Sequence, residues 1–336
     1  MAAEEAPPAV AAGEVAVADG NKRAMKKLHW YTIRWQTAVA IGVLFLGAWT
    51  LLFGQYRHDK GHGPAGPSVS LAAFAKTWST NQYVLIGIGD SVTAGYGATP
   101  HHSYFELLQT NDDTLDPTLK GCDLRHVLPN LAIRNYAVSY TVSAEHLRDQ
   151  VPHLKRHPQS VHGIVVITTG GNDLIHDYGR GPARDGAMYG CRFDQALVWK
   201  ENFRTRLRSI LEGVTTQFPG GCDIFLANIY DPTDAVGDIE HANLLLPAWP
   251  DGIKVLPLFN QVITETCRSY PNVHLVDFYS EFLGHGIHCS NWLNHHYRNA
   301  DPHYWYFDNL EDPNDRGYDA IRRLFLNEMA KVFVHP

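Results

Sequence analysis

VLIGIGDSVTAGYG, residues 84–97 of this 336-residue chain, changes character halfway along. Its first six residues are apolar or glycine, and the polar pair Asp90 and Ser91 follows directly. Continuous apolar runs are typical of parallel strands that are buried on both faces, and functional residues of open α/β sheets collect at the carboxyl ends of such strands. The stretch therefore predicts a buried strand that delivers Ser91 to a turn at its carboxyl end.

A serine in this position has two interpretations. A serine hydroxyl is a poor nucleophile alone, so catalysis requires a base within hydrogen-bond reach and donors for a developing oxyanion. Asp90 and Ser91 also fit a simple turn or helix cap, since both residue types are favoured before helices. The rest of the chain has to decide between these two.

A second stretch, GIVVITTGGND at residues 163–173, repeats the pattern of an apolar strand followed by glycines and polar residues. Together the two stretches resemble the GDSL or SGNH family of serine hydrolases. The resemblance implies that Ser91 is the nucleophile and that the Asn172 side chain contributes to the oxyanion hole. It also implies a three-layer α/β fold of the flavodoxin-like type.

The wider pattern agrees with a doubly wound sheet. Apolar strand-like segments occur near residues 84, 132, 164, 224 and 273, separated by stretches long enough for crossover helices. Helical periodicity is clear in residues 196–218 and 321–332. We expect a five-stranded parallel sheet with helices on both faces.

The segment from 131 to 141 resembles the second block of the family but departs from it at one position. The family places a glycine where this chain has Tyr140. A tyrosine keeps the backbone N–H that the family uses as an oxyanion donor, so the expected oxyanion hole comprises Ser91, Tyr140 and Asn172. The Tyr140 side chain must then point away from the substrate, and it narrows the pocket or weakens the hole.

The final block departs further. The family pattern D-x-x-H-P-N-x-x-G aligns with NLEDPNDRG at residues 309–317, so that Asn309 replaces the aspartate and Asp312 replaces the histidine. If the chain is a hydrolase, a residue outside this block must supply the general base.

Two histidines between residues 277 and 312 are candidates for that base. His285 lies between two glycines that allow a tight loop. In the preferred arrangement His285 is the base and Asp312, at the start of the last helix, orients it. His303, with Asp301 or Asp308, is the alternative.

Other classes of site have weaker support. Histidines and a cysteine between residues 285 and 296 include ligand types that zinc accepts, but their spacing matches no strong zinc pattern. The resemblance needs no metal and no cofactor. A net charge of −7 and the lack of a basic stripe argue against nucleic acid as a partner.

The N-terminal region differs in composition from the rest. We expect a disordered cytoplasmic tail over 1–28, a single transmembrane anchor over 29–57, a linker over 58–78 and the hydrolase domain over 79–336. The uncharged apolar run 37–54 reaches the length of a membrane span, and the basic residues before it place the N-terminus in the cytoplasm. The catalytic domain would then be periplasmic or extracellular, where up to two disulfides could form among five cysteines.

These observations predict a membrane-anchored serine ester hydrolase, of the esterase or lipase type, that works through an acyl-enzyme. Its substrate is a small-molecule, lipid or glycan ester. Two alternatives stand beside it: an O-acyltransferase acting on envelope glycans, and a glycan- or lipid-binding module of the same fold that has lost its base.

Overall fold

The structure is a computed structural model that describes residues 25–26, 30, 34–49, 58–179, 188–242 and 246–334. The chain divides into two compact units, Met1–Arg57 and His58–Pro336. The second unit carries every residue that the sequence analysis assigns to the site.

A five-stranded parallel sheet forms the centre of the second unit, in the order β2-β1-β3-β4-β5. The strands are β1 (Gln82–Gly89), β2 (Leu131–Asn135), β3 (Val161–Thr168), β4 (Cys222–Ala227) and β5 (Val273–Val276). Each lies where the apolar segments predict it, and the order is that of the flavodoxin-like doubly wound fold. The predicted sheet is confirmed.

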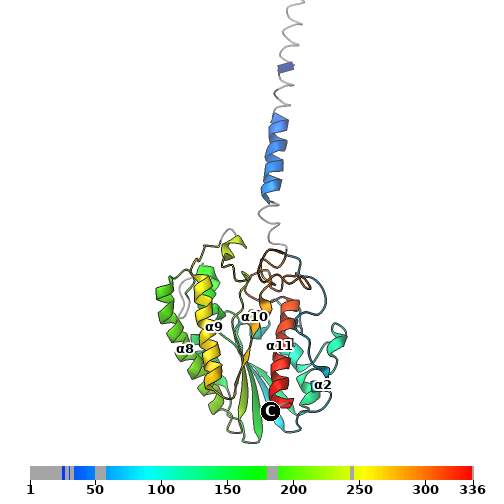
Figure 1. The fold of residues 1–336 in the computed structure, drawn as a ribbon, viewed down its shortest axis with the longest axis vertical. Coiled ribbons are helices and arrows are strands. Elements are labelled where there is room, and N and C mark those ends of the chain that lie inside the picture. Colours follow the sequence, from blue (N-terminus) through cyan, green and yellow to red (C-terminus); the bar gives the residue numbers. More distant parts are fainter. Residues whose placement is uncertain are drawn as a thin grey trace, which may run out of the picture. The chain divides into compact units, whose positions relative to one another are not determined.

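Helices cover both faces of this sheet (Figure 1). The α-helices are α2 (Leu71–Phe74), α3 (Ser91–Ala94), α4 (Tyr104–Gln109), α5 (Leu124–Val127), α6 (Ser143–Glu145), α7 (Gly171–Ile175), α8 (Phe193–Thr216), α9 (Gly252–Ser269), α10 (Phe278–Phe282) and α11 (Asp315–Val334). The shorter helical turns are η1 (Pro117–Leu119), η2 (His146–Gln150), η3 (Val151–His153), η4 (His176–Gly179) and η5 (Ile239–His241). Helices α8 and α9 lie on one side of the sheet, and α2, α10 and α11 lie on the other.

The strands feed two separate cores because successive side chains of a strand point to opposite faces. In β1, Ile86 and Ile88 pack with Phe203 of α8 and Phe259 of α9, whereas Leu85 belongs to the cluster that contains Phe325 of α11. These side chains are essentially inaccessible to solvent. Burial on both faces explains the uninterrupted apolar run in the sequence.

Residues 58–78, interpreted above as a linker, pack against the domain. The backbone N–H of Ala65 donates to the Asp319 carboxylate at 2.8 Å, and Phe74 is buried in the core on the α11 side. This segment is therefore part of the folded unit.

The N-terminal unit contains a helix over residues 34–49. Within the residues that the structure describes, no helix combines the length and the hydropathy of a membrane span. Part of the apolar run 37–54 lies outside the described residues. The expected anchor therefore stays a prediction.

All five cysteines lie in the described part of the chain and have free thiols, so no disulfide bond joins any two of them. The disulfides that the sequence analysis allowed for are therefore not formed in this structure.

Gly89 ends β1 in a conformation that only glycine adopts easily, with φ at +141°. A Cβ atom at this position would lie 2.6 Å from Thr168 Oγ1 and closer still to the Thr168 carbonyl oxygen. The absence of a side chain lets β1 lie against β3 just before the site.

We expect Gly89→Ala to lower the free energy of unfolding by about 3 kcal/mol or more, because backbone strain and a steric clash add together. Urea denaturation measures this. Gly190→Ala is the matched control: Gly190 also has a positive φ, +82°, but a Cβ atom there would meet no described atom within 4 Å. The free energy of unfolding is expected to fall by about 1 kcal/mol in Gly190→Ala. Equal losses in the two variants would contradict the steric argument.

Candidate active site

The end of β1 positions Ser91. Asp90 caps the short helix α3, and its Oδ1 accepts a hydrogen bond from Val92 N at 3.2 Å. Gly95 closes the helix with φ at +87°. Because Ser91 is the first residue of α3, its backbone N–H has no acceptor within the helix. Both the hydroxyl and the N–H of Ser91 are thus presented at the carboxyl edge of the sheet.

The end of β3 positions Asn172 beside it. Gly170 takes a φ of +97°, and the chain then enters α7. Asn172 Nδ2 donates one hydrogen bond to the Thr141 carbonyl at 3.0 Å, which fixes the amide. The side chain of an amide has a second N–H, which suits an oxyanion donor.

The segment with Tyr140 is held against α7. Asp173 accepts from the backbone N–H of Ser143 at 2.8 Å and from its hydroxyl at 2.5 Å. Tyr140 itself has φ at +69°, a conformation that favours glycine, and its side chain is 47% exposed. The structure thus places a tyrosine in glycine-like geometry, and Tyr140 lines a cavity that also contains Ser91 and Asn172.

Asp312 is the ionisable side chain that the structure brings to Ser91. Burial raises the pKa of the Asp312 carboxyl, and hydrogen bonding from Ser91 and Asn309 lowers it by a smaller amount. Asn309 Nδ2 donates to Asp312 Oδ2 at 2.7 Å. Asp312 Oδ1 is buried and has no partner of standard hydrogen-bond geometry in the described part of the chain, so the contact with Ser91 is a loose one. Catalytic hydrogen bonds are often long before substrate binds.

Asn309 is locked in one orientation. Its Oδ1 accepts from the backbone N–H groups of Glu311 and Asp312, at 3.2 and 3.1 Å. The amide nitrogen must then face the Asp312 carboxylate. Asn309 therefore orients Asp312 as a donor.

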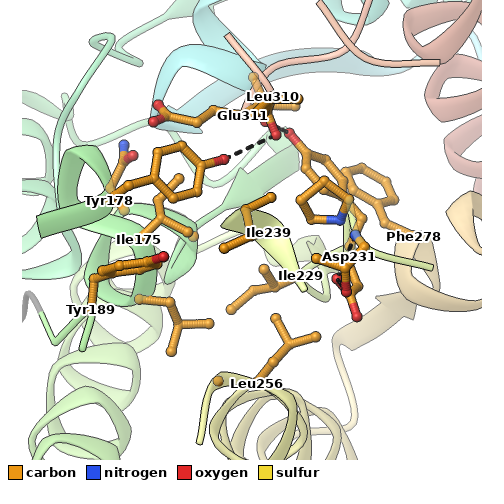
Figure 2. Close-up of a pocket in the computed structure, with 18 of the residues that line it drawn as sticks. Ile175, Tyr178, Tyr189, Ile229, Asp231, Ile239, Leu256, Phe278, Leu310 and Glu311 are labelled. Carbon is orange, nitrogen blue, oxygen red and sulfur yellow. Dashed lines mark hydrogen bonds between the residues drawn. The ribbon is translucent and has the colours of Figure 1, made fainter. Parts of the chain in front are cut away.

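Two tyrosines, the buried Tyr178 and the half-buried Tyr230, hold the loop that carries Asp312. The Tyr178 hydroxyl donates to the Leu310 carbonyl at 3.2 Å (Figure 2). The Tyr230 hydroxyl donates to the Glu311 carbonyl. Leu310 has φ at +68°, an unfavourable value for leucine that the surrounding bonds maintain. Sequence reasoning did not identify either tyrosine, because no local pattern marks a hydroxyl that reaches a distant carbonyl.

Asp90 is a second buried carboxyl next to Ser91. Its pKa is raised to about 7, chiefly by burial and to a smaller extent by the nearby Asp312, against the lowering effect of a hydrogen bond from the Thr168 hydroxyl. Thr168 Oγ1 donates to Asp90 Oδ1 at 2.8 Å. Asp90 is therefore largely a structural cap and also an electrostatic neighbour of Asp312.

The two histidines favoured by the sequence lie elsewhere. His285 is 2% exposed and stacks on Trp305 with ring centroids 3.4 Å apart. Its Nδ1 donates to the His303 carbonyl at 3.0 Å, and burial lowers its pKa to about 4. The flanking glycines, Gly284 and Gly286, donate their backbone N–H groups to Asp234, which turns the histidine inward instead of exposing it.

The His303 side chain is also held by a hydrogen bond outside the site. Its Nδ1 bonds to Asp301 Oδ1 at 2.5 Å, and Asp301 Oδ2 pairs with Arg316 at 2.5 Å. Among the side chains that the structure describes, no histidine lines either of the cavities that contain Ser91. The structure thus brings together Ser91, Asn172, Tyr140 and Asp312, and it does not bring His285, His303 or Asp301 to them.

Two cavities meet at Ser91. The first, of about 120 Å³, is mainly apolar and runs between η4, β4 and α9. The second, of about 440 Å³, is more polar. Its lining residues include Tyr96, Tyr140, Asp308, Asn309 and Asp312. Five residues line both cavities: Ser91, Asn172, Tyr178, Leu310 and Glu311.

Residues 88–320 match the model of the GDSL-like lipase/acylhydrolase family. The chain belongs to this family. Its class is therefore that of the serine hydrolases that act on ester bonds, and the resemblance based on the first and third blocks is confirmed. Among curated proteins, none matches this GDSL-like chain significantly.

Three of the solved structures that this chain resembles are named as lipases or esterases. A lipase from a goat rumen metagenome is 17% identical with a TM-score of 0.42, covering 73% of this chain and 96% of the lipase. An esterase from Pseudoalteromonas is 17% identical with a TM-score of 0.42, covering 75% and 99%. An extracellular lipase from Streptomyces rimosus is 15% identical with a TM-score of 0.45, covering 72% and 98%.

No group of three or more potential metal-ligating side chains occurs in the described residues.

Proposed function

We propose that this GDSL-like protein hydrolyses esters with Ser91 as nucleophile and Asp312, in place of a histidine, as the general base. The observation that carries this proposal is the buried Asp312 carboxylate, in contact with Ser91 on one side and held by the Asn309 amide on the other. Burial raises the pKa of Asp312, which makes its carboxylate a stronger base than an exposed aspartate.

The replacements at positions 309 and 312 are then one coupled change. The family pairs an aspartate acceptor with a histidine, which donates one N–H to it and uses its other nitrogen as the base. In this chain the base is itself an acceptor, so its partner must be a donor, and Asn309 supplies one. The hydrogen bond is retained with its direction reversed.

The proposed reaction runs in two steps. Ser91 Oγ attacks the acyl carbon while Asp312 takes the hydroxyl proton, and the oxyanion is stabilised by the N–H groups of Ser91 and Tyr140 and by the Asn172 amide. Protonated Asp312 then delivers its proton to the departing alcohol. Water, deprotonated by Asp312, attacks the acyl-enzyme and releases the carboxylic acid and Ser91.

An organophosphate tests the nucleophile directly. Diethyl p-nitrophenyl phosphate forms a P–O bond with an activated serine as p-nitrophenolate leaves. Mass spectrometry of the full-length chain is expected to find one diethylphosphoryl group, on Ser91, and hydrolysis of p-nitrophenyl acetate is expected to fall in step with labelling. Ser91→Ala should take no label, while Ser139→Ala, a serine of the same cavity, should be labelled normally. Labelling of another residue, or no labelling beside normal hydrolysis, would refute the proposal; absence of both would favour the binding module.

The proposal includes a membrane anchor in the N-terminal unit. Support comes from the uncharged run 37–54, the preceding basic residues, and the large exposed fractions of apolar side chains in the helix over 34–49, such as 73% for Leu44 and 70% for Phe45. The hydrolase domain would lie on the periplasmic or extracellular side. Alkaline carbonate extraction tests the anchor, since release of the chain into the supernatant would rule out a spanning segment.

A further inference from the structure

The first cavity has the composition of a site for an aliphatic chain. Its walls include Ile175, Ile229 and Ile239, and Figure 2 shows these side chains around an open centre. Cavities lined mainly by apolar side chains with a few polar groups at one place are typical of ligand sites. We refer to this cavity as the apolar chamber.

Two polar side chains of the chamber wall, Asp231 and Asn228, already have hydrogen-bond partners within the protein. Asp231 accepts from the backbone and hydroxyl of Thr233 at 2.8 and 2.7 Å. Asn228 donates to Asp277 at 2.7 Å and accepts from the Tyr279 N–H at 2.8 Å. Neither side chain requires a polar partner from a ligand, so the chamber suits a group without hydrogen-bonding atoms.

One side of the chamber is the reaction centre. Ser91 and Asn172 line it together with Leu310 and Glu311, and the same four residues line the second cavity. An ester whose carbonyl lies at Ser91 can therefore extend its two arms into different cavities. The aliphatic arm fits the apolar chamber, and the polar arm fits the cavity that contains Asp308 and Asn309.

Helix α9 closes the other side. Leu256 lies across the chamber from Leu310 and Glu311 (Figure 2). Trp249, just before the helix, also lines the chamber and is fixed by a hydrogen bond from its Nε1 to the Cys191 carbonyl at 2.8 Å. These two side chains set the depth that is open to a substrate.

The volume limits the chain length. An apolar cavity of about 150 Å³ is known to accept benzene, so a chamber of 120 Å³ holds about five carbon atoms. We propose that the apolar chamber receives the acyl chain of the ester and that Leu256 limits this chain to about four to six carbons. The inference rests on the proposed ester hydrolysis at Ser91.

The test is a series of p-nitrophenyl esters from acetate to decanoate, hydrolysed by the full-length chain. Each methylene that enters the chamber is expected to raise kcat/KM about fourfold, until the chain reaches about five carbons, beyond which the value should fall. Leu256→Trp fills the chamber and should move the maximum to two to four carbons, whereas Leu256→Ala should move it to about eight. Leu258→Ala is the matched control, because Leu258 is on the same helix but does not line the chamber.

Binding of pentanamide, measured by calorimetry, gives a readout that does not depend on catalysis. It should bind the wild type and the Leu258→Ala variant more tightly than decanamide does, and it should lose at least tenfold in affinity in Leu256→Trp. If the esters are not hydrolysed but this pattern of binding is seen, the chamber stands and the proposed catalysis fails. If kcat/KM keeps rising to decanoate, or Leu256→Trp changes neither the ester profile nor pentanamide binding, the chamber inference fails and the hydrolase remains.

Discussion

Asp312→Asn is expected to lower kcat for ester hydrolysis at pH 8 by about a thousandfold, within the 10²- to 10⁴-fold range of a lost general base. An asparagine has the same shape and can still accept from Asn309 Nδ2, so the loop should keep its structure. It cannot take the proton of Ser91. Steady-state kinetics with p-nitrophenyl butyrate measures the loss.

The matched control is Asp308→Asn. Asp308 lines the same cavity, but its side chain is 75% exposed and pairs with Lys60 at 2.7 Å. Its removal changes the local charge by the same amount without touching Ser91, and kcat should change less than threefold. Equal effects of the two substitutions would show that Asp312 acts only through its charge.

The ionisation of Asp312 predicts how the activity changes with pH. The active form of Asp312 is the carboxylate, and burial raises its pKa above the ordinary value of about 3.9. Activity should therefore be complete well above this raised pKa and be lost as the pH falls through it. The part of the acid limb that belongs to Asp312 should disappear in Asp312→Asn.

The sheet was predictable because burial on both faces leaves a direct mark on sequence. Residues 84–89 and 163–167 are all apolar or glycine, and the polar residues that follow them lie at the carboxyl edge where the topology brings adjacent strands together. The proximity of Ser91 and Asn172 was therefore predictable, because each residue follows one of two adjacent buried strands. The place of Tyr140 in the second block located it in the site. Its positive φ was not predictable, because this conformation is uncommon for a tyrosine.

The general base was harder to predict, because the usual residue type, histidine, indicated His285, whereas the position in the final block indicated Asp312. A search for histidine led to His285, whose glycine neighbours indicated a loop tip. In the structure those glycines allow close packing on Asp234, and Trp305 covers the imidazole. The aligned frame 309–317 alone would have pointed to Asp312. Position in the fold decides which side chain faces Ser91, and chemistry then decides what it can do there.

If Asn309 and Asp312 form one coupled unit, exchanging both should work better than exchanging either one. In Asn309→Asp, a carboxyl would replace the amide that now lies 2.7 Å from Asp312 Oδ2. Two carboxylates at this distance share a proton, which raises the pKa of the pair and blocks the base. We expect a loss of at least about a hundredfold in kcat/KM at neutral pH.

Asp312→His alone should fail for a different reason. The Asn309 amide nitrogen faces position 312 because Asn309 Oδ1 is held by two backbone N–H groups. A donor in this place favours the imidazole tautomer whose hydrogen points at Ser91, so the ring cannot accept the serine proton. An asparagine in place of the orienting aspartate costs about 10⁴-fold in a serine protease for this reason.

The double variant, Asn309→Asp with Asp312→His, restores an aspartate acceptor for the imidazole and leaves its other nitrogen as the base. We expect kcat/KM at least tenfold above that of either single variant, and an acid limb near the ordinary histidine pKa of about 6.5. Full pH profiles of the four proteins form a double-mutant cycle that isolates the coupling between the two positions. A double variant whose loss equals the product of the two single losses would show that the replacements are independent, and the reversed hydrogen bond would then have no part in catalysis.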